Sequence, residues 1–216
     1  MIRRAATLAA MAMAMAGSTT AEKSPHRLVW NVSGSVPTGL YLVRPASHPT
    51  VATLAVAVPP EPLATFLAEG SYLPRGVPLL KPILALRGQT VCRTGLVITI
   101  DGCAIGLARE RDHRGRPLPA WQGCRVIGED EVFLMNPDEP ASFDGRYFGA
   151  IPISALAGRA EPLWTSAQEH RRDGDTAPRC GRHRSSWPAS LRRFGKATAA
   201  ANVANAAPLP DLPPAK

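Results

Sequence analysis

The sequence of 216 residues lacks any run of about 18 continuous apolar residues, the length that a membrane-spanning helix needs. This absence argues against a polytopic membrane protein. The sequence also has no Cys-x-x-Cys pair, no His-rich spacing and no internal repeat. We therefore predict no metal site and no cofactor. Turn-forming residues are plentiful, with 22 Pro and 18 Gly, and they favour many short elements over a helical bundle.

Acidic residues are scarce, with 17 Asp+Glu against 25 Lys+Arg and a formal net charge of +8. Such a balance suggests nucleic-acid binding only where the positive charge covers a folded domain. Here residues 1–22 carry +1 and residues 165–216 carry +5, which leaves +2 for residues 23–164. Because the central segment is nearly neutral, we expect no nucleic-acid partner.

The two ends differ from the middle in composition. Residues 1–22 place Arg3 and Arg4 before the apolar stretch AATLAAMAMAMAG, an order typical of a signal peptide. Cleavage and retention as a short membrane anchor both remain open, and an amphipathic first helix is the alternative. Residues 165–216 are rich in Arg, Ala, Pro and Ser and lack apolar periodicity, so they are predicted to form a disordered tail. Residues 23–164 form the predicted domain.

Short apolar runs separated by Gly, Pro and Asp-Gly predict strands through that domain. Asp101 and Gly102 are typical of a hairpin turn. The predicted strands span residues 28–32, 40–43, 53–58, 78–86, 96–100 and 131–135.

A single short helix is predicted over residues 60–69. Leu63, Phe66 and Leu67 would lie on one face, and Gly70 would end the helix. Short strands with one helix indicate a mainly-β domain.

The sequence has four cysteines, which allow three disulfide pairings. Export would favour their oxidation, whereas free buried thiols remain possible if the domain is not exported. The cysteines are Cys92, Cys103, Cys124 and Cys180.

The first candidate for chemistry is Ser35, in the stretch NVSGSVPTGLY (31–41). It follows a predicted strand in a Ser-Gly-Ser-x-Pro turn. A serine on a sharp turn can present its hydroxyl and its own N–H to one substrate carbonyl. An ordinary Ser/Gly/Pro turn has the same composition and is the alternative.

The second candidate is Lys81, the only charged residue in the apolar run of residues 78–86. A buried strand would disfavour the ammonium form and lower the pKa of the amine, as a lysine general base requires. The alternative is a lysine whose amine reaches solvent from a strand edge.

The third candidate is the stretch ASFDGRYFG (141–149). If it is extended, Ser142, Asp144 and Arg146 share one face, and the two charged residues can form an ion pair. The alternative is a surface strand with an exposed salt bridge.

In this order the three stretches resemble the type I signal peptidase family, and especially its conjugative-transfer branch, the TraF peptidases. In that branch Ser-x-Ser-x-Pro-x-Gly-Leu-Tyr precedes a lysine-containing apolar strand, and Ser-x-Asp-x-Arg-Tyr-x-Gly closes the site. The resemblance covers about residues 28–164. It implies a signal-peptidase-like complex β fold, and Pro37, two residues after Ser35, favours the conjugative branch.

The resemblance implies a Ser–Lys dyad. Ser35 matches the nucleophile and Lys81 the general base, while the N–H of Ser35 and the hydroxyl of Ser33 match the donors of the oxyanion hole. Ser142 matches the serine that orients the lysine amine.

Three further features follow from the same resemblance. Asp144 and Arg146 match a supporting pair under the site. Cys92 and Cys124 match a disulfide of the branch, which leaves two cysteines without assigned partners, Cys103 and Cys180. Gly145 stands where the family usually has a serine.

The implied function is that of a serine endopeptidase, exported or anchored at the periplasmic face of the inner membrane. Its peptide substrate would be the precursor of a conjugative pilin, which some members of the branch convert to a cyclic form by transpeptidation. A general type I signal peptidase that processes exported preproteins is one alternative. A non-catalytic exported β-domain of a conjugation or secretion apparatus is the other.

Overall fold

The computed structural model describes residues 28–166. The targeting segment predicted over 1–22, Cys180 and all but the first two residues of the predicted tail lie outside the described residues. No helix within residues 28–166 is long and apolar enough to cross a membrane.

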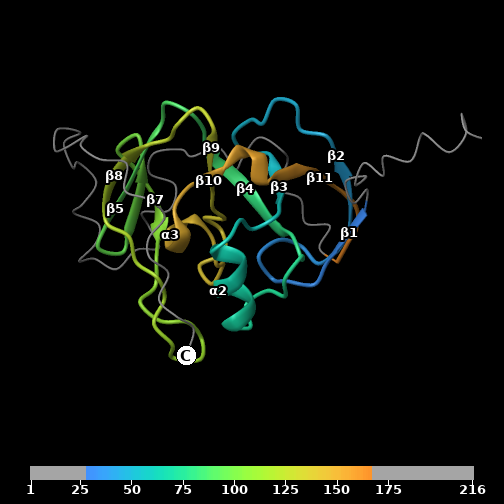
Figure 1. Ribbon diagram of the computed structural model, residues 1–216, viewed down its shortest axis with the longest axis horizontal. Helices are drawn as coiled ribbons and strands as arrows, with labels where there is room; N and C mark the ends of the chain where they lie inside the picture. The colour runs from blue at the N-terminus through green and yellow to red at the C-terminus, as the bar shows by residue number, and fades with distance from the viewer. Residues whose placement is uncertain (1–27, 167–216) are drawn as a thin grey trace, which may run out of the picture.

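The larger of two antiparallel sheets has seven strands, and β4 lies in its interior between β3 and β9. Its strand order is β1 (Leu28–Asn31), β2 (Gly39–Arg44), β11 (Leu156–Thr165), β3 (Leu54–Ala57), β4 (Leu79–Ala85), β9 (Glu131–Leu134) and β10 (Ile151–Pro152). Figure 1 shows β1, β2 and β11 at one end of the molecule, with β4 and β9 near its middle.

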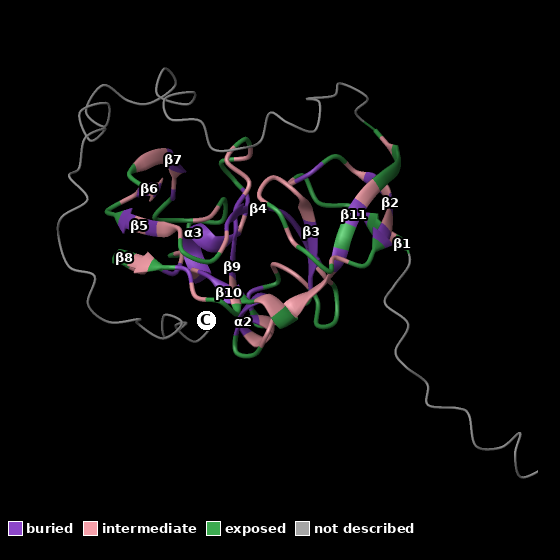
Figure 2. Cartoon of the chain, turned by 90° about the horizontal axis from the view of Figure 1, so that it is seen from above, coloured by how far each residue is buried: buried purple, intermediate pink, exposed green. Residues whose placement is uncertain are grey.

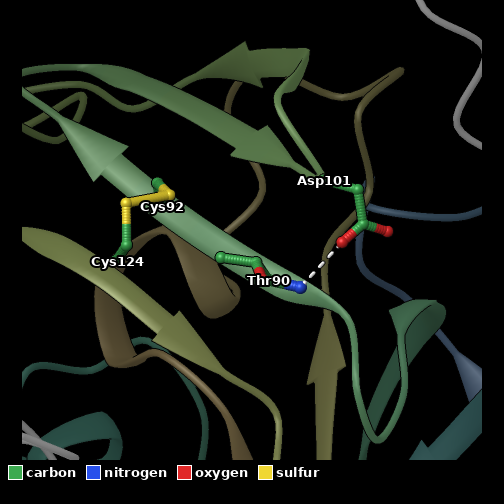
Figure 3. Close-up of a disulfide and its surroundings, with 4 residues drawn as sticks. All are labelled: Thr90, Cys92, Asp101 and Cys124. Atoms are coloured by element: carbon green, nitrogen blue, oxygen red, sulfur yellow. Dashed lines mark hydrogen bonds between the residues drawn. A yellow bond between two sulfur atoms is a disulfide. The ribbon is translucent and has the colours of Figure 1, made fainter. Parts of the chain in front are cut away.

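The smaller sheet has the order β7 (Cys103–Leu107), β6 (Val97–Ile100), β5 (Thr90–Thr94) and β8 (Gly123–Val126). Asp101 and Gly102 join β6 to β7 with φ values of 49° and 74°, so the predicted hairpin turn is confirmed. The Asp101 carboxylate also accepts a hydrogen bond from the N–H of Thr90 at 2.8 Å, which ties the turn to β5 (Figure 3).

A disulfide joins β5, a central strand of the smaller sheet, to the edge strand β8. Cys92 of β5 and Cys124 of β8 are directly opposite each other, with Cα atoms 4.0 Å apart, and their sulfurs are bonded (Figure 3). The pairing that the resemblance implied is therefore confirmed. None of the cysteines within residues 28–166 is a free thiol.

The predicted helix is present as α2 (Leu63–Glu69), three residues shorter at its start than expected. Leu63, Phe66 and Leu67 are buried as predicted, and the helix ends at Gly70. Two shorter helical segments follow later in the chain, α3 (Gly145–Phe148) and the 3₁₀ turn η1 (Ile153–Ala155).

All seven residues of β4 are buried, because the strand contacts three separate groups of core residues. Leu79 and Ile83 pack with the residues beneath α2, Leu84 packs with the smaller sheet, and Leu80 packs with β2 and β11. Figure 2 shows β4 and most of β9 coloured as buried. A charged side chain in β4 therefore has little access to solvent.

Candidate active site

The loop between β1 and β2, residues 32–38, carries the first two predicted site residues, and we call it the serine turn. The buried side chain of Asn31 holds it from within. Its Nδ2 donates to the carbonyl oxygens of Ser33 at 2.9 Å, Val36 at 3.0 Å and Pro37 at 3.1 Å. Its Oδ1 accepts from the N–H and the hydroxyl of Ser33, at 3.1 and 2.8 Å. The side-chain amide of Asn31 thus provides hydrogen-bond partners for several main-chain groups of the turn.

Ser33 and Ser35 present their hydroxyls to each other. Their Oγ atoms are 3.0 Å apart, and Ser35 is half-buried while Ser33 is exposed. The structure therefore brings together the residue matched to the nucleophile and the one matched to the oxyanion hole.

Lys81 lies in the middle of β4 and is 3% exposed. Its Nζ donates a hydrogen bond to the Oγ of Ser142 at 2.7 Å. Burial lowers the pKa of Lys81 from 10.5 to about 8, although Asp144 acts in the opposite direction. Lys81 thus lies in a buried strand, as the apolar run predicts, and contacts Ser142, the residue that the resemblance placed beside its amine. The alternative of an amine that reaches solvent from a strand edge is wrong.

Asp144 and Arg146 form a buried ion pair rather than an exposed one. Both side chains are at most 1% exposed, and Arg146 Nη2 and Nε lie 2.8 and 2.9 Å from the carboxylate of Asp144. The segment is not the extended strand that would place the two side chains on one face: Asp144 caps the N-terminus of α3 and accepts from the N–H of Arg146 at 3.1 Å. A side chain that caps a helix start can reach the residue two positions later without a shared strand face.

The guanidinium of Arg146 also holds the loop that contains Ser142. Although burial opposes its charge, Asp144 raises the pKa of Arg146 above its ordinary value. Its remaining hydrogen bonds go to main-chain carbonyl oxygens, those of Leu107 (3.3 Å), Asn136 (3.0 Å), Glu139 (2.8 Å) and Ser142 (3.3 Å). Arg146 therefore fixes the backbone on both sides of the residue that binds Lys81.

Glycine at position 145 fits its surroundings. A Cβ atom there would lie 2.6 Å from the ring of Phe133 and 2.7 Å from the carbonyl oxygen of Leu134. Gly145 thus allows close packing of α3 against β9.

A cleft of about 440 Å³ joins these groups. Ser33, Ser35, Lys81 and Ser142 all line it, beside apolar residues of β1, α2 and β4. In the structure of residues 28–166, the Lys81 amine binds Ser142 and the Ser35 hydroxyl binds Ser33, with no hydrogen bond between Ser35 and Lys81. In free enzymes such catalytic contacts are often long and shorten when substrate binds. Within the same residues, no group of three His, Cys, Asp or Glu side chains could hold a metal ion.

Two asparagines of the site were missed by sequence reasoning, Asn31 and Asn136. Asn136 lies after β9, and its side-chain Nδ2 donates to the carbonyl oxygen of Ser35. Asn31 is the first residue of the motif that singled out Ser35, yet its role depends on a turn conformation that composition does not reveal. Asn136 precedes Pro137 and follows the apolar run of residues 131–135, and this sequence pattern could have predicted a structured loop there.

The chain matches the family described as signal peptidase, peptidase S26, over residues 2–164. It therefore belongs to the S26 signal peptidase family. Within that family it is similar to conjugal transfer proteins, as the resemblance to the TraF branch predicted. The probable conjugal transfer protein TraF of Sinorhizobium fredii (strain NBRC 101917 / NGR234) is 33% identical over 171 residues, which cover 74% of this chain and 88% of the relative.

Other known proteins also resemble the chain. The plasmid transfer protein TraF of Escherichia coli is 31% identical over 166 residues, which cover 74% of this chain and 90% of the relative. A solved structure of signal peptidase I from Enterococcus faecalis V583 is 16% identical, with a TM-score of 0.32, and covers 52% of this chain and 97% of that one.

Proposed function

We propose that the chain is a serine endopeptidase in which Ser35 is the nucleophile and Lys81 the general base. One observation carries the proposal: the amine of Lys81 is buried, held by Ser142 and faces the same cleft as Ser35. A buried amine with a pKa near 8 is neutral in about a tenth of molecules at pH 7, far more often than a lysine with the ordinary pKa of 10.5. Such an amine can accept a proton without a histidine.

In this mechanism the Ser35 hydroxyl attacks the scissile carbonyl while its proton passes to Lys81 Nζ. The tetrahedral oxyanion accepts hydrogen bonds from the N–H of Ser35 and the hydroxyl of Ser33. The Ser33 hydroxyl donates to Asn31 in the resting structure, so it must rotate toward the oxyanion. Lys81 then donates its proton to the leaving amine, and water releases the acyl group by the reverse sequence.

The proposed substrate is the precursor of a conjugative pilin. The support is the similarity to relatives named as conjugal and plasmid transfer proteins. If an amine of the pilin reaches the acyl-enzyme before water, the same intermediate yields a cyclic product by transpeptidation. The reaction would take place at the periplasmic face of the inner membrane, where an exported precursor is available.

Acylation by a serine-directed lactam probe tests the catalytic proposal. We expect the full chain to carry the probe on Ser35, located by peptide mass mapping, and the Ser35→Ala variant to carry none. The same preparations are then incubated with the pilin precursor and with a generic preprotein. Absence of both acylation and cleavage would favour the non-catalytic β-domain. Equal cleavage of the two substrates would favour a general signal peptidase.

The peptidase rate is expected to rise with pH and to level off above about 8. Burial lowers the pKa of Lys81 to about 8, and only the neutral amine can accept the proton of Ser35. Below that pH the neutral fraction falls about tenfold per pH unit. The measurement is kcat/KM for one peptide substrate between pH 6 and pH 10. A midpoint near the ordinary lysine value of 10.5 would contradict the assignment of the buried amine as the base.

A further inference from the structure

Asn136 links the buried ion pair to the serine turn, and each of its polar groups has a partner. Its N–H donates to the carboxylate of Asp144 at 3.1 Å, and its carbonyl oxygen accepts from Arg146 Nη2 at 3.0 Å. Its side-chain Oδ1 accepts from the N–H of Asp138 at 3.0 Å. Its Nδ2 donates to the carbonyl oxygen of Ser35. The backbone of Asn136 is therefore fixed by the ion pair, and its side chain reaches the turn.

Two series of hydrogen bonds thus start from the ion pair of Asp144 and Arg146. One passes from Arg146 to the carbonyl of Ser142, and the hydroxyl of Ser142 binds the amine of Lys81. The other passes through Asn136 to Ser35. The nucleophile and the base come from different parts of the chain, so their separation depends on how the serine turn sits relative to the loop that carries Ser142.

Asn136 provides the hydrogen bond that sets this arrangement. Asn31 binds the serine turn from within and does not connect it to the loop of residues 136–142. Thr38 binds Ser166 at 2.6 Å, at the far end of the turn. The hydrogen bond from Asn136 to the carbonyl oxygen of Ser35 joins the serine turn to the Ser142 loop.

We propose that Asn136 is a positioning residue that holds Ser35 at the distance from Lys81 that acylation requires. The inference rests on the proposed function. Asn136 does not touch the reacting atoms; its amide fixes the carbonyl of the nucleophile residue. A displacement of about 1 Å at a reacting group can lower a rate by about 10²-fold.

An isosteric substitution separates positioning from packing. Asn136→Asp keeps the shape of the side chain and the acceptor for Asp138, but it replaces the donor to Ser35 with an oxygen that repels the carbonyl. Asn136→Ala removes the donor without adding repulsion. If Asn136 only fills space, Ala should be the more harmful change; if it positions Ser35, Asp should be.

The test measures acylation of the full chain by the serine-directed lactam probe over a range of probe concentrations. We expect Asn136→Asp to lower the limiting acylation rate by about 10²-fold and Asn136→Ala by a smaller factor. The half-saturating probe concentration should stay within about twofold of wild type. Thr38→Ala, which removes the side-chain hydrogen bond from the far end of the serine turn to Ser166, is the matched control and should stay within about threefold of wild type.

Several results would overturn the inference: an unchanged limiting rate in Asn136→Asp, an equal loss in Thr38→Ala, or a greater loss in Ala than in Asp. Thermal unfolding identifies any variant that does not fold. If Asn136→Asp is such a variant, the comparison of Asn136→Ala with Thr38→Ala decides, and equal rates overturn the inference. Failure of the proposed function looks different, because wild type itself would then not be acylated at Ser35.

Discussion

The Lys81→Met substitution is expected to abolish peptidase activity. It should also remove a pH-dependent decrease in the free energy of unfolding that the buried amine causes. Proton transfer by a positioned side chain contributes about 10²–10⁴ in rate, and methionine cannot accept a proton. We therefore expect kcat to fall by at least this factor. The methionine should fit, because all residues of β4 are buried and Leu80 and Pro82, the chain neighbours of Lys81, are apolar, although the hydroxyl of Ser142 loses its partner.

The folding penalty follows from the lowered pKa of Lys81. The amine titrates near 8 in the folded chain and near 10.5 when it is solvated, so between these values the unfolded chain binds more protons. Wild-type stability should therefore rise with pH across this window, and the penalty is complete below about pH 8. A shift of this size corresponds to about 3 kcal/mol.

Chemical denaturation at a series of pH values measures this effect. The free energy of unfolding of wild type, minus that of Lys81→Met, should increase by most of about 3 kcal/mol between pH 7 and pH 10. Groups common to both proteins cancel in this difference. Leu84→Met is the matched control, since Leu84 is a fully buried, uncharged residue of the same strand. A difference that is constant with pH would show that the folded chain does not depress the pKa of Lys81.

The buried strand around Lys81 could be predicted from local composition, whereas the burial of its amine was one of two interpretations that the stretch left open. A long apolar run with a single lysine is typical of a strand inside a sheet. β4 is such a strand, and its residues contact three groups of core residues. The Asp101–Gly102 turn and the apolar face of α2 were predictable for the same reason, since each depends on neighbouring residues only.

Features that depend on distant partners were not predictable. The sequence left open whether the segment with Asp144 and Arg146 is extended, and it is a helical turn that Asp144 caps and that packs against Phe133 of β9. The sequence of strand β11 lacks the simple alternation of apolar and polar residues that predicts a strand. Its pairing register shifts near Gly158 and Pro162, which interrupts that alternation. A Cβ atom at Gly158 would lie 2.4 Å from the carbonyl oxygen of Arg44 on β2, a contact that exists only after pairing.

Arg146→Met is expected to destabilise the domain by about 3–5 kcal/mol, because it leaves one member of a buried ion pair without its partner. The carboxylate of Asp144 is 0% exposed, and its remaining donors would be main-chain N–H groups. The carbonyl oxygens that Arg146 binds would lose this donor as well, and buried acceptors without a partner add to the loss.

The same substitution at an exposed ion pair provides the control. Arg44 pairs with Glu161 at 3.2 Å, but both side chains are largely solvated, so Arg44→Met should change the free energy of unfolding by about 1 kcal/mol or less. Denaturation of the two variants and wild type at pH 7 gives the comparison. A second variant, Asp144→Asn combined with Arg146→Met, should recover part of the loss because it removes the unpaired charge. Equal stabilities of the single and double variants would mean that Arg146 acts through its carbonyl contacts alone. In that case the loop of residues 136–142, and with it the position of Ser142 against Lys81, would depend on the guanidinium's geometry rather than on its charge.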